Sequence, residues 1–245
     1  MIKDSVTDPL VAEAPPLLEL SGIRAAYGSI EVLHGVDLVV PQGSVVALLG
    51  PNGAGKTTAL NVACGLIQPT AGKVIIAGRD VTGAKPEDLA RRGVITIPEG
   101  KGVFPNLTVR ENLQMATYSG RKLADIEAMV YERFPRLGER RKQLAGTMSG
   151  GEQQMLALGR GLASDPALLF LDELSMGLAP LVVEELYGIV AQIARSGVSV
   201  LVVEQFARTV LGVADRAAIM VGGRVRRVGA PAEIEEELSA AYLGG

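Results

Sequence analysis

Short apolar runs, separated by turns rich in glycine and proline, recur along most of the chain. Continuous apolar runs are typical of strands that are buried on both faces of a parallel sheet, and alternating runs of strands that are half exposed. The pattern predicts strands at Leu17–Ile23, Glu31–Val40, Val45–Leu49, Lys73–Ile76, Val94–Ile97, Leu168–Leu171, Val198–Val203, Ala217–Val221 and Arg224–Val228. We expect the early strands to form an antiparallel flank of the fold.

Two capping boxes mark helix starts. Thr108 and Glu111 have the spacing of the first box, which predicts a helix through Met115, and a helical pattern continues over Leu123–Phe134. Ser149 and Glu152 form the second box, and the apolar positions of a helix follow it at Met155, Leu156, Leu158 and Leu162. These helices are expected to interrupt the sheet over about residues 102–161, as an inserted helical subdomain.

A further helix is predicted to begin at Pro180, because proline is well suited to a first helical turn. Its apolar stripe indicates a helix that packs against the core and ends near Gly197. The residues of this stripe are Leu181, Val182, Leu186, Ile189, Val190 and Ile193.

The length of 245 residues suits one α/β domain with a smaller helical insertion, and a hydrophobic content of 48% is enough for a substantial core. Residues 1–16 form a polar, proline-ended segment that we interpret as a flexible tail, and residues 17–245 as the single domain. The one cysteine, Cys64, rules out an internal disulfide. We expect it to pack in the core, on the helix that follows residues 50–58.

The charge balance and the hydropathy pattern exclude several classes of protein. Lys and Arg number 24 against 27 Asp and Glu, so nothing indicates a nucleic-acid partner. No eighteen apolar residues run without interruption, and the first residues lack the apolar core of a signal peptide. The chain is therefore expected neither to span a membrane nor to be exported.

The segment 50–58 carries the clearest chemistry. It reads GPNGAGKTT directly after an apolar strand and fits the phosphate-binding pattern G-x-x-x-x-G-K-[ST]. Its backbone N–H groups are expected to face phosphate oxygens at the start of a helix. Lys56 is expected to reach the β- and γ-phosphates, and the Thr57 hydroxyl to bind Mg²⁺. The candidate nucleotide-binding residues here are Gly50, Pro51, Asn52, Gly53, Ala54, Gly55, Lys56, Thr57 and Thr58.

Two adjacent acids follow the apolar run Leu168–Leu171. In open α/β sheets the ligands bind at the carboxyl ends of the strands, which is where these acids emerge. Asp172 is the candidate carboxylate for Mg²⁺. Glu173 is the candidate catalytic residue that orients or deprotonates the attacking water.

The Ser-Gly-Gly-Glu segment supports two interpretations. It is a helix cap, which is a purely structural feature. A helix start that carries a hydroxyl and two glycines is also suited to bind an anion, so Ser149, Gly150, Gly151 and Glu152 are candidates for binding a γ-phosphate. Since the chain already contains one phosphate loop, a second such site implies a second subunit.

These ordered motifs resemble those of the ATP-binding-cassette ATPases, from about Leu17 to the end of the chain. The resemblance implies a P-loop NTPase (RecA-like) α/β core with an antiparallel β flank and an inserted helical subdomain. It also implies Mg²⁺-dependent ATP hydrolysis by two cassettes packed head to tail. ATP would then lie between the phosphate loop of one cassette and Ser149 of the other, with Tyr27 stacked on the adenine.

Three positions depart from the commoner pattern of that family. Glu99, in Ile97-Pro98-Glu99-Gly100, stands where a glutamine is usual, and as a carboxylate it favours coordination of the metal. Gln205 stands where a histidine usually senses the γ-phosphate; its amide can still donate a hydrogen bond, but it does not titrate near neutral pH. Ala179 replaces an aspartate that is common in relatives, which leaves the contacts of that loop across the subunit interface open.

Four segments are similar to those of ATPase subunits of bacterial branched-chain amino-acid importers. In this chain they read IPEGKGVFPNLTVRENL, LDELSMGLAP, VEQF and AYLGG. The resemblance implies a cytoplasmic subunit, held at the inner face of the membrane by integral-membrane permeases and served indirectly by a solute-binding protein. The second cassette is either an identical chain or a paralogue in such systems. Phe104, Pro105 and Leu107 are candidates for the groove that contacts the permease, or simply pack the subdomain.

Other functions stay open at this point. Import of another small solute, such as urea, competes with amino-acid import, because the cargo is selected by other subunits. A cassette ATPase without a transport role would usually carry a second cassette or a long coiled-coil insertion, and neither is visible. A P-loop kinase or a switch GTPase would share residues 50–58 but has no use for the segment 149–154.

Overall fold

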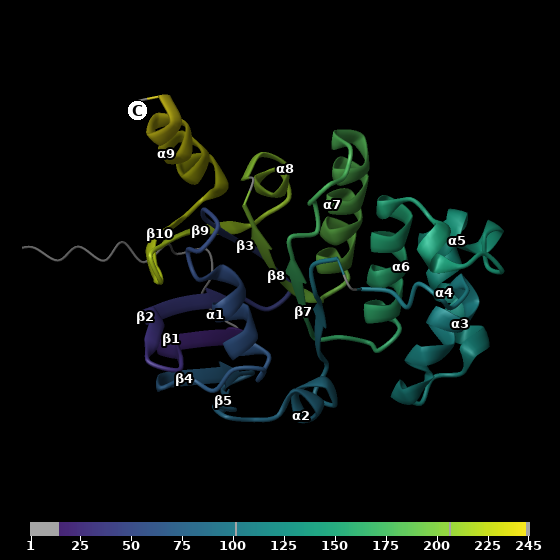
Figure 1. The fold of residues 1–245 in the computed structure, drawn as a ribbon, viewed down its shortest axis with the longest axis horizontal. Coiled ribbons are helices and arrows are strands. Elements are labelled where there is room, and N and C mark those ends of the chain that lie inside the picture. Colours follow the sequence, from purple (N-terminus) through teal and green to yellow (C-terminus); the bar gives the residue numbers. More distant parts are fainter. Residues whose placement is uncertain (1–14, 101, 206, 244–245) are drawn as a thin grey trace, which may run out of the picture.

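The computed structural model describes residues 15–100, 102–205 and 207–243, so most of the predicted tail, residues 1–16, lies outside the described residues. Two sheets and a group of helices form the described part of the chain (Figure 1). The first sheet is antiparallel and has the order β2-β1-β4-β5, which confirms the predicted flank. Its strands are β1 (Leu18–Tyr27), β2 (Ile30–Val40), β4 (Ala71–Ile76) and β5 (Arg79–Asp80).

The second sheet is mostly parallel and has the order β10-β9-β3-β8-β7-β6. Only β10 runs antiparallel to its neighbour, β9. Its strands are β3 (Val45–Leu49), β6 (Val94–Ile97), β7 (Leu168–Asp172), β8 (Ser199–Glu204), β9 (Arg216–Val221) and β10 (Arg224–Gly229). This is the α/β arrangement that the apolar runs predict.

Helices cover both faces of this parallel sheet. The described helices, not all of which touch this sheet, are α1 (Lys56–Ala63), α2 (Pro86–Ala90), α3 (Val109–Gln114), α4 (Leu123–Arg133), α5 (Pro135–Glu139), α6 (Gly150–Leu162), α7 (Pro180–Arg195), α8 (Ala207–Leu211) and α9 (Pro231–Leu243), with 3-10 turns η1 (Met115–Ser119) and η2 (Ala145–Thr147). Among the described residues, no helix is long and apolar enough to cross a membrane.

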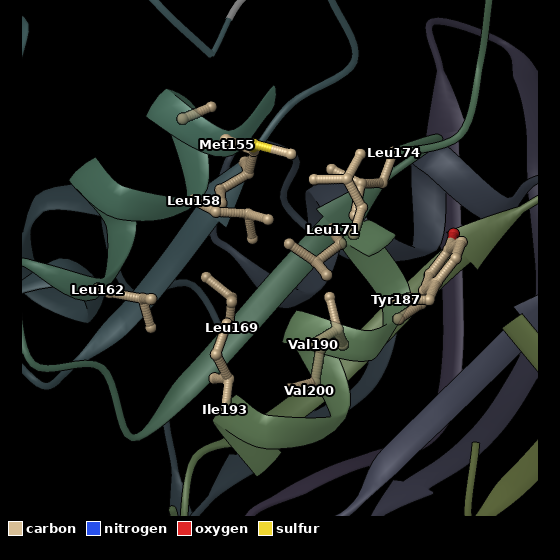
Figure 2. Packing of buried hydrophobic residues seen from close by; sticks show 14 of the residues in the cluster. Met155, Leu158, Leu162, Leu169, Leu171, Leu174, Tyr187, Val190, Ile193 and Val200 are labelled. Carbon is tan, nitrogen blue, oxygen red and sulfur yellow. The ribbon is translucent and has the colours of Figure 1, made fainter. Parts of the chain in front are cut away.

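The two faces of the parallel sheet belong to different hydrophobic clusters. Along β3, Val45, Ala47 and Leu49 pack in a cluster with α6 and α7, whereas Val46 and Leu48 pack in a cluster with α1 and the antiparallel sheet. Figure 2 shows the first cluster, in which side chains of α6, β7 and α7 meet. Because successive residues of a strand point to opposite faces, a continuous apolar run can serve both clusters.

The helices α3, α4 and α5 lie between β6 and α6 in the sequence, where the helical insertion is predicted, and they pack against α6 (Figure 1). Both predicted capping boxes are present. Thr108 caps α3 with Glu111, and Ser149 caps α6 with Glu152. Each box satisfies backbone N–H groups that the first turn of a helix leaves without a partner. The division of the chain into a domain and a subdomain stays a prediction.

The predicted packing stripe of α7 is wrong at Leu181. This side chain is 79% exposed, whereas Val183 and Tyr187 are buried with Leu186 and Val190. The helix begins at Pro180, so Leu181 lies in its first turn, on the side that faces away from the sheet. Pattern matching also missed the short elements β5, α2 and α5, and Cys64 caps the end of α1 rather than lying within it, although it is buried as expected.

The positions of Leu186 and Leu181 make a prediction about stability. Leu186→Ala removes a fully buried side chain from the cluster between α7 and the sheet, and should lower the free energy of unfolding by about 2–5 kcal/mol. Leu181→Ala in the same helix is the control and should change it by less than about 0.5 kcal/mol. Urea denaturation of both variants measures the difference. Equal losses would contradict the assigned face of α7.

Candidate nucleotide site

The phosphate loop connects the end of β3 to the start of α1. Gly55 occupies the N-cap of α1 with φ 102°, in the left-handed region that other residues adopt at a cost. A Cβ atom there would also lie 3.0 Å from Leu33 Cδ2 and 3.1 Å from Met220 Cε. Both facts explain the glycine. The first turn of α1 leaves backbone N–H groups without a partner inside the helix, and these are the groups that the pattern predicts to face phosphate.

Lys56 is the first residue of α1 and is 4% exposed. Its ammonium group donates to the carbonyl oxygens of Gly50, at 2.9 Å, and Pro51, at 3.3 Å. It also lies 3.7 Å from Glu173 Oε1. The lysine is therefore held inside the loop, beside the carboxylate that is predicted to act on water.

Thr57 and Asp172 meet although they are far apart in the sequence. Thr57 Oγ1 donates a hydrogen bond of 3.3 Å to Asp172 Oδ1. Burial raises the pKa of Asp172 to about 6; the hydrogen bond from Thr57 opposes this shift, and the negative charges of Glu173 and Glu99 add to it. A buried carboxylate surrounded by like charges gains from a cation, which is the environment that a Mg²⁺ ligand requires.

The register of the parallel strands brings the remaining catalytic candidates to the same edge of the sheet. Leu49 pairs with Glu204, and Asp172 pairs with Val203. The next residue of each strand therefore emerges at that edge: Gly50 after β3, Gln205 after β8 and Glu173 after β7. Glu173 has φ 47° and donates its backbone N–H to the carbonyl of Val203 at 2.9 Å, so its backbone is tied to β8 in a conformation that is uncommon for glutamate.

Ser149 and the phosphate loop of the same chain belong to helices on opposite faces of the sheet. Ser149 caps α6, which packs on the face of the sheet opposite to α1. Ser149 and Gly150 are exposed, whereas Gly151 and Glu152 are buried. Glu152 Oε2 accepts hydrogen bonds from the backbone N–H and the hydroxyl of Ser149, and its carboxylate also pairs with Arg140 at 3.3 Å. The start of α6 is thus exposed, and these hydrogen bonds and the ion pair hold it in place.

The other predicted residues are Tyr27, Glu99 and Ala179. Tyr27, at the end of β1, is 52% exposed. Glu99, in the loop after β6, is exposed and close enough to Asp172 to act on its pKa. Ala179 is the N-cap of α7. Among the described side chains, neither Tyr27 nor Glu99 forms a hydrogen bond or an ion pair with residues 50–58, so their roles stay predictions.

The donor set fits Mg²⁺ better than a metal held by the protein alone. The described residues contain no cluster of three or more His, Cys, Asp or Glu side chains that could hold a metal ion. Mg²⁺ commonly binds through one or two protein oxygens while phosphates and water supply the rest. One hydroxyl, of Thr57, and one buried carboxylate, of Asp172, are such a set.

A groove runs between the sheet edge and the helices that precede α6. It is lined by β6 and the loop after it, by η1 and by α6, including Pro98, Gly102, Tyr118 and Arg160. The Arg160 guanidinium donates to the carbonyl of Gly102 and stacks over the Phe104 ring at 4.5 Å. Tyr118 is 70% exposed and Phe104 is 42% exposed. Sequence patterns indicated Phe104 for this surface and missed Tyr118 and Arg160, which reach it from other elements.

Sequence reasoning also missed Glu204, which is 2% exposed at the end of β8. Its carboxylate accepts hydrogen bonds from Ser175 and Tyr187. The available signal was an acid at the end of an apolar strand, the same signal that identifies Asp172. The partners of Glu204 could not be found from that signal.

Comparison with known proteins agrees with this geometry. Residues 33–175 match the family model of the ABC transporter. The chain is 43% identical to the high-affinity branched-chain amino acid transport ATP-binding protein BraG of Pseudomonas aeruginosa, over 94% of this chain and 100% of that protein. It is 30% identical to BraF of the same organism, which carries the same description, over 94% of this chain and 98% of that protein.

A solved structure with a similar fold is the ADP conformation of an ATP-binding cassette of an ABC transporter. The TM-score is 0.83 at 26% sequence identity, and the match covers 92% of this chain and 95% of the other. The family match, the relatives and the cassette fold lead to one conclusion. This chain belongs to the ABC transporter family, as an ATP-binding subunit that hydrolyses ATP.

Proposed function

We propose that this chain drives the uptake of branched-chain amino acids, as the ATPase subunit of an importer. The observation that carries the proposal is the 43% identity to BraG over the whole length of that protein. The site geometry supports the ATPase half of the proposal, and the choice of cargo rests on the relatives.

Transport measurements test the cargo. The chain should be assembled with the permeases and the solute-binding protein encoded beside it and reconstituted in vesicles. We expect leucine, isoleucine and valine to stimulate ATP hydrolysis and to accumulate in an ATP-dependent manner. Stimulation by urea and not by these amino acids would contradict the cargo while leaving the ATPase assignment intact.

The residues at the sheet edge divide the chemistry of ATP hydrolysis. Lys56 and the backbone of residues 50–58 bind the β- and γ-phosphates of ATP. Thr57 and Asp172 would hold Mg²⁺, with Glu99 as a further oxygen ligand, and the bound ion would supply positive charge next to the phosphates. Glu173 orients the attacking water and accepts its proton. The Gln205 amide donates a hydrogen bond to the γ-phosphate from the next strand.

The second half of the site comes from another cassette, either an identical chain or a paralogue. The exposed start of α6, at Gly150, offers backbone N–H donors on the opposite side of the sheet from α1, next to the Ser149 hydroxyl, which donates to Glu152. Two chains packed head to tail place this start against the γ-phosphate bound by the partner, with Tyr27 against the adenine. Binding of ATP therefore draws the two cassettes together, and hydrolysis removes their shared anchor.

The groove lined by Tyr118 and Arg160, with Phe104 beside it under the Arg160 guanidinium, is the proposed contact with the integral-membrane permease. It presents exposed aromatic rings next to a guanidinium group, a composition typical of protein interfaces. It borders the loop of Glu99 and the helix that Ser149 caps, so a partner seated there can act on both parts of the site. The subunit is thereby held at the cytoplasmic side of the membrane, and a solute-binding protein acts only through the permease.

Glu173→Gln tests the assignment of the residue that acts on water. Glutamine keeps the size of the side chain and loses the ability to accept a proton, so the turnover number for ATP should fall at least about 100-fold. The dissociation constant for ATP should stay within about twofold. Glu184→Gln, an exposed position on α7, is the control and should keep its full rate. A Glu173→Gln variant that hydrolyses ATP at the wild-type rate would remove Glu173 from this role.

Tyr118→Glu tests the contact with the permease. Glutamate removes the aromatic ring from the contact and brings a charge that loses its hydration when the permease docks, so less of the variant should co-purify with the membrane subunits. Val39→Glu places the same charge on an exposed residue of the antiparallel sheet and serves as the control. Equal recovery of both variants with the permease would contradict docking in this groove.

A further inference from the structure

Glu204 is a buried carboxylate for which the proposed hydrolysis has no use so far. It is the last residue of β8 and is 2% exposed. Three donors converge on it. The Ser175 backbone N–H donates to Oε1 at 2.9 Å, the Ser175 hydroxyl donates to Oε2 at 2.9 Å, and the Tyr187 hydroxyl donates to Oε1. The carboxylate is therefore saturated by partners from within the chain.

These partners come from two other segments. Ser175 lies in the loop that follows Glu173, and Tyr187 lies on α7, two turns beyond the end of that loop. Tyr187 is 1% exposed, and in Figure 2 its hydroxyl points away from Val190 and Ile193, at the polar end of an otherwise apolar cluster. Glu204 thus ties β8, the loop after β7 and α7 together at one point.

Such an arrangement is hard to explain by stability alone. A buried carboxylate loses its hydration, and an apolar side chain of similar volume often stabilises a core as well or better. Burial raises the pKa of Glu204, and the hydrogen bonds from Tyr187 and Ser175 oppose that shift. The role of Glu204 is therefore better explained by the positions of the segments that it holds together than by its contribution to stability.

That geometry concerns both residues proposed to act in hydrolysis. Gln205 directly follows Glu204 at the end of β8. Glu173 lies two residues before Ser175, and its backbone N–H binds the carbonyl of Val203, the residue before Glu204. Its φ of 47° is a conformation that persists only where the surroundings hold it in place. The hydrogen bonds from Ser175 to Glu204 tie the loop after β7 to β8 at a second point, two residues after Glu173.

We propose that Glu204 is a positioning residue for ATP hydrolysis: through Ser175 and Tyr187 it holds Glu173 and Gln205 in register across the ends of β7 and β8. The proposal rests on the proposed roles of Glu173 and Gln205. It predicts that loss of the network slows the chemical step and leaves binding of ATP unchanged, because the phosphate loop belongs to β3 and α1 and makes none of these bonds.

The experiment compares four variants in the full chain. Glu204→Ala and Tyr187→Phe each break the network, and both should lower the turnover number for ATP, by about tenfold or more for Glu204→Ala, because small displacements of a catalytic group are costly. The dissociation constant for ATP should stay within about twofold. Glu204→Gln should recover most of the rate, because its amide oxygen can accept from Tyr187 and from the Ser175 N–H while its NH₂ donates to the Ser175 hydroxyl.

Tyr131→Phe is the matched control. Tyr131, on α4, donates its hydroxyl to Glu127 Oε1 at 3.2 Å, so this variant loses the same kind of tyrosine–glutamate bond away from the ends of β7 and β8. Its turnover number should equal that of the wild type. If Glu204→Ala fails to fold, the comparison of Tyr187→Phe with Tyr131→Phe decides the question, because each keeps its ring.

Two results would overturn the proposal. One is a turnover number of Tyr187→Phe that matches that of Tyr131→Phe. The other is a Glu204→Gln variant as slow as Glu204→Ala, which would assign the role to the charge and not to the geometry. Failure of the Glu173 assignment itself is seen separately, in the rate of Glu173→Gln, because the Glu204 variants are compared with the wild type.

Discussion

The site depends on the parallel register of three neighbouring strands. Leu49 of β3 pairs with Glu204 of β8, and Val203 of β8 pairs with Asp172 of β7. These strands are buried on both faces, so a shift by one residue would move every side chain into the wrong cluster. The packing that stabilises the fold therefore also sets which residues emerge together at the carboxyl edge. The hydrogen bond from Thr57 to Asp172 is one consequence of this constraint.

The same constraint explains what could be predicted from the sequence. The phosphate loop and the two capping boxes are local patterns, in which the interacting residues lie within a few positions, and the structure has them where they were expected. The position of Asp172 at the carboxyl edge of the sheet could be predicted because it is an acid at the end of a continuous apolar run. The stripe of α7 failed at Leu181 because apolar periodicity does not tell which side of a first helical turn faces the core.

The network of Glu204 could not be derived in this way. Tyr187 lies 17 residues before Glu204 and Ser175 lies 29 residues before it, so their meeting depends on how α7 packs across the sheet. The groove at Tyr118 and Arg160 has the same origin, since it combines η1, α6 and the loop after β6. Patterns of spacing report chemistry that is local or that ends on a strand, and packing between distant helices supplies the rest.

The opposite faces of the sheet also shape the proposed mechanism. α1, which is proposed to bind phosphate at its start, and α6, which Ser149 caps, belong to separate clusters on the two sides. In the proposed mechanism each chain presents two incomplete halves of a nucleotide site, and a head-to-tail pair would complete both. Light scattering of Glu173→Gln with saturating ATP and Mg²⁺, alone and mixed with a paralogous cassette, measures this pairing directly. The account predicts the mass of two chains, which returns to one when ADP replaces ATP. A single-chain mass in every ATP-saturated sample would contradict it.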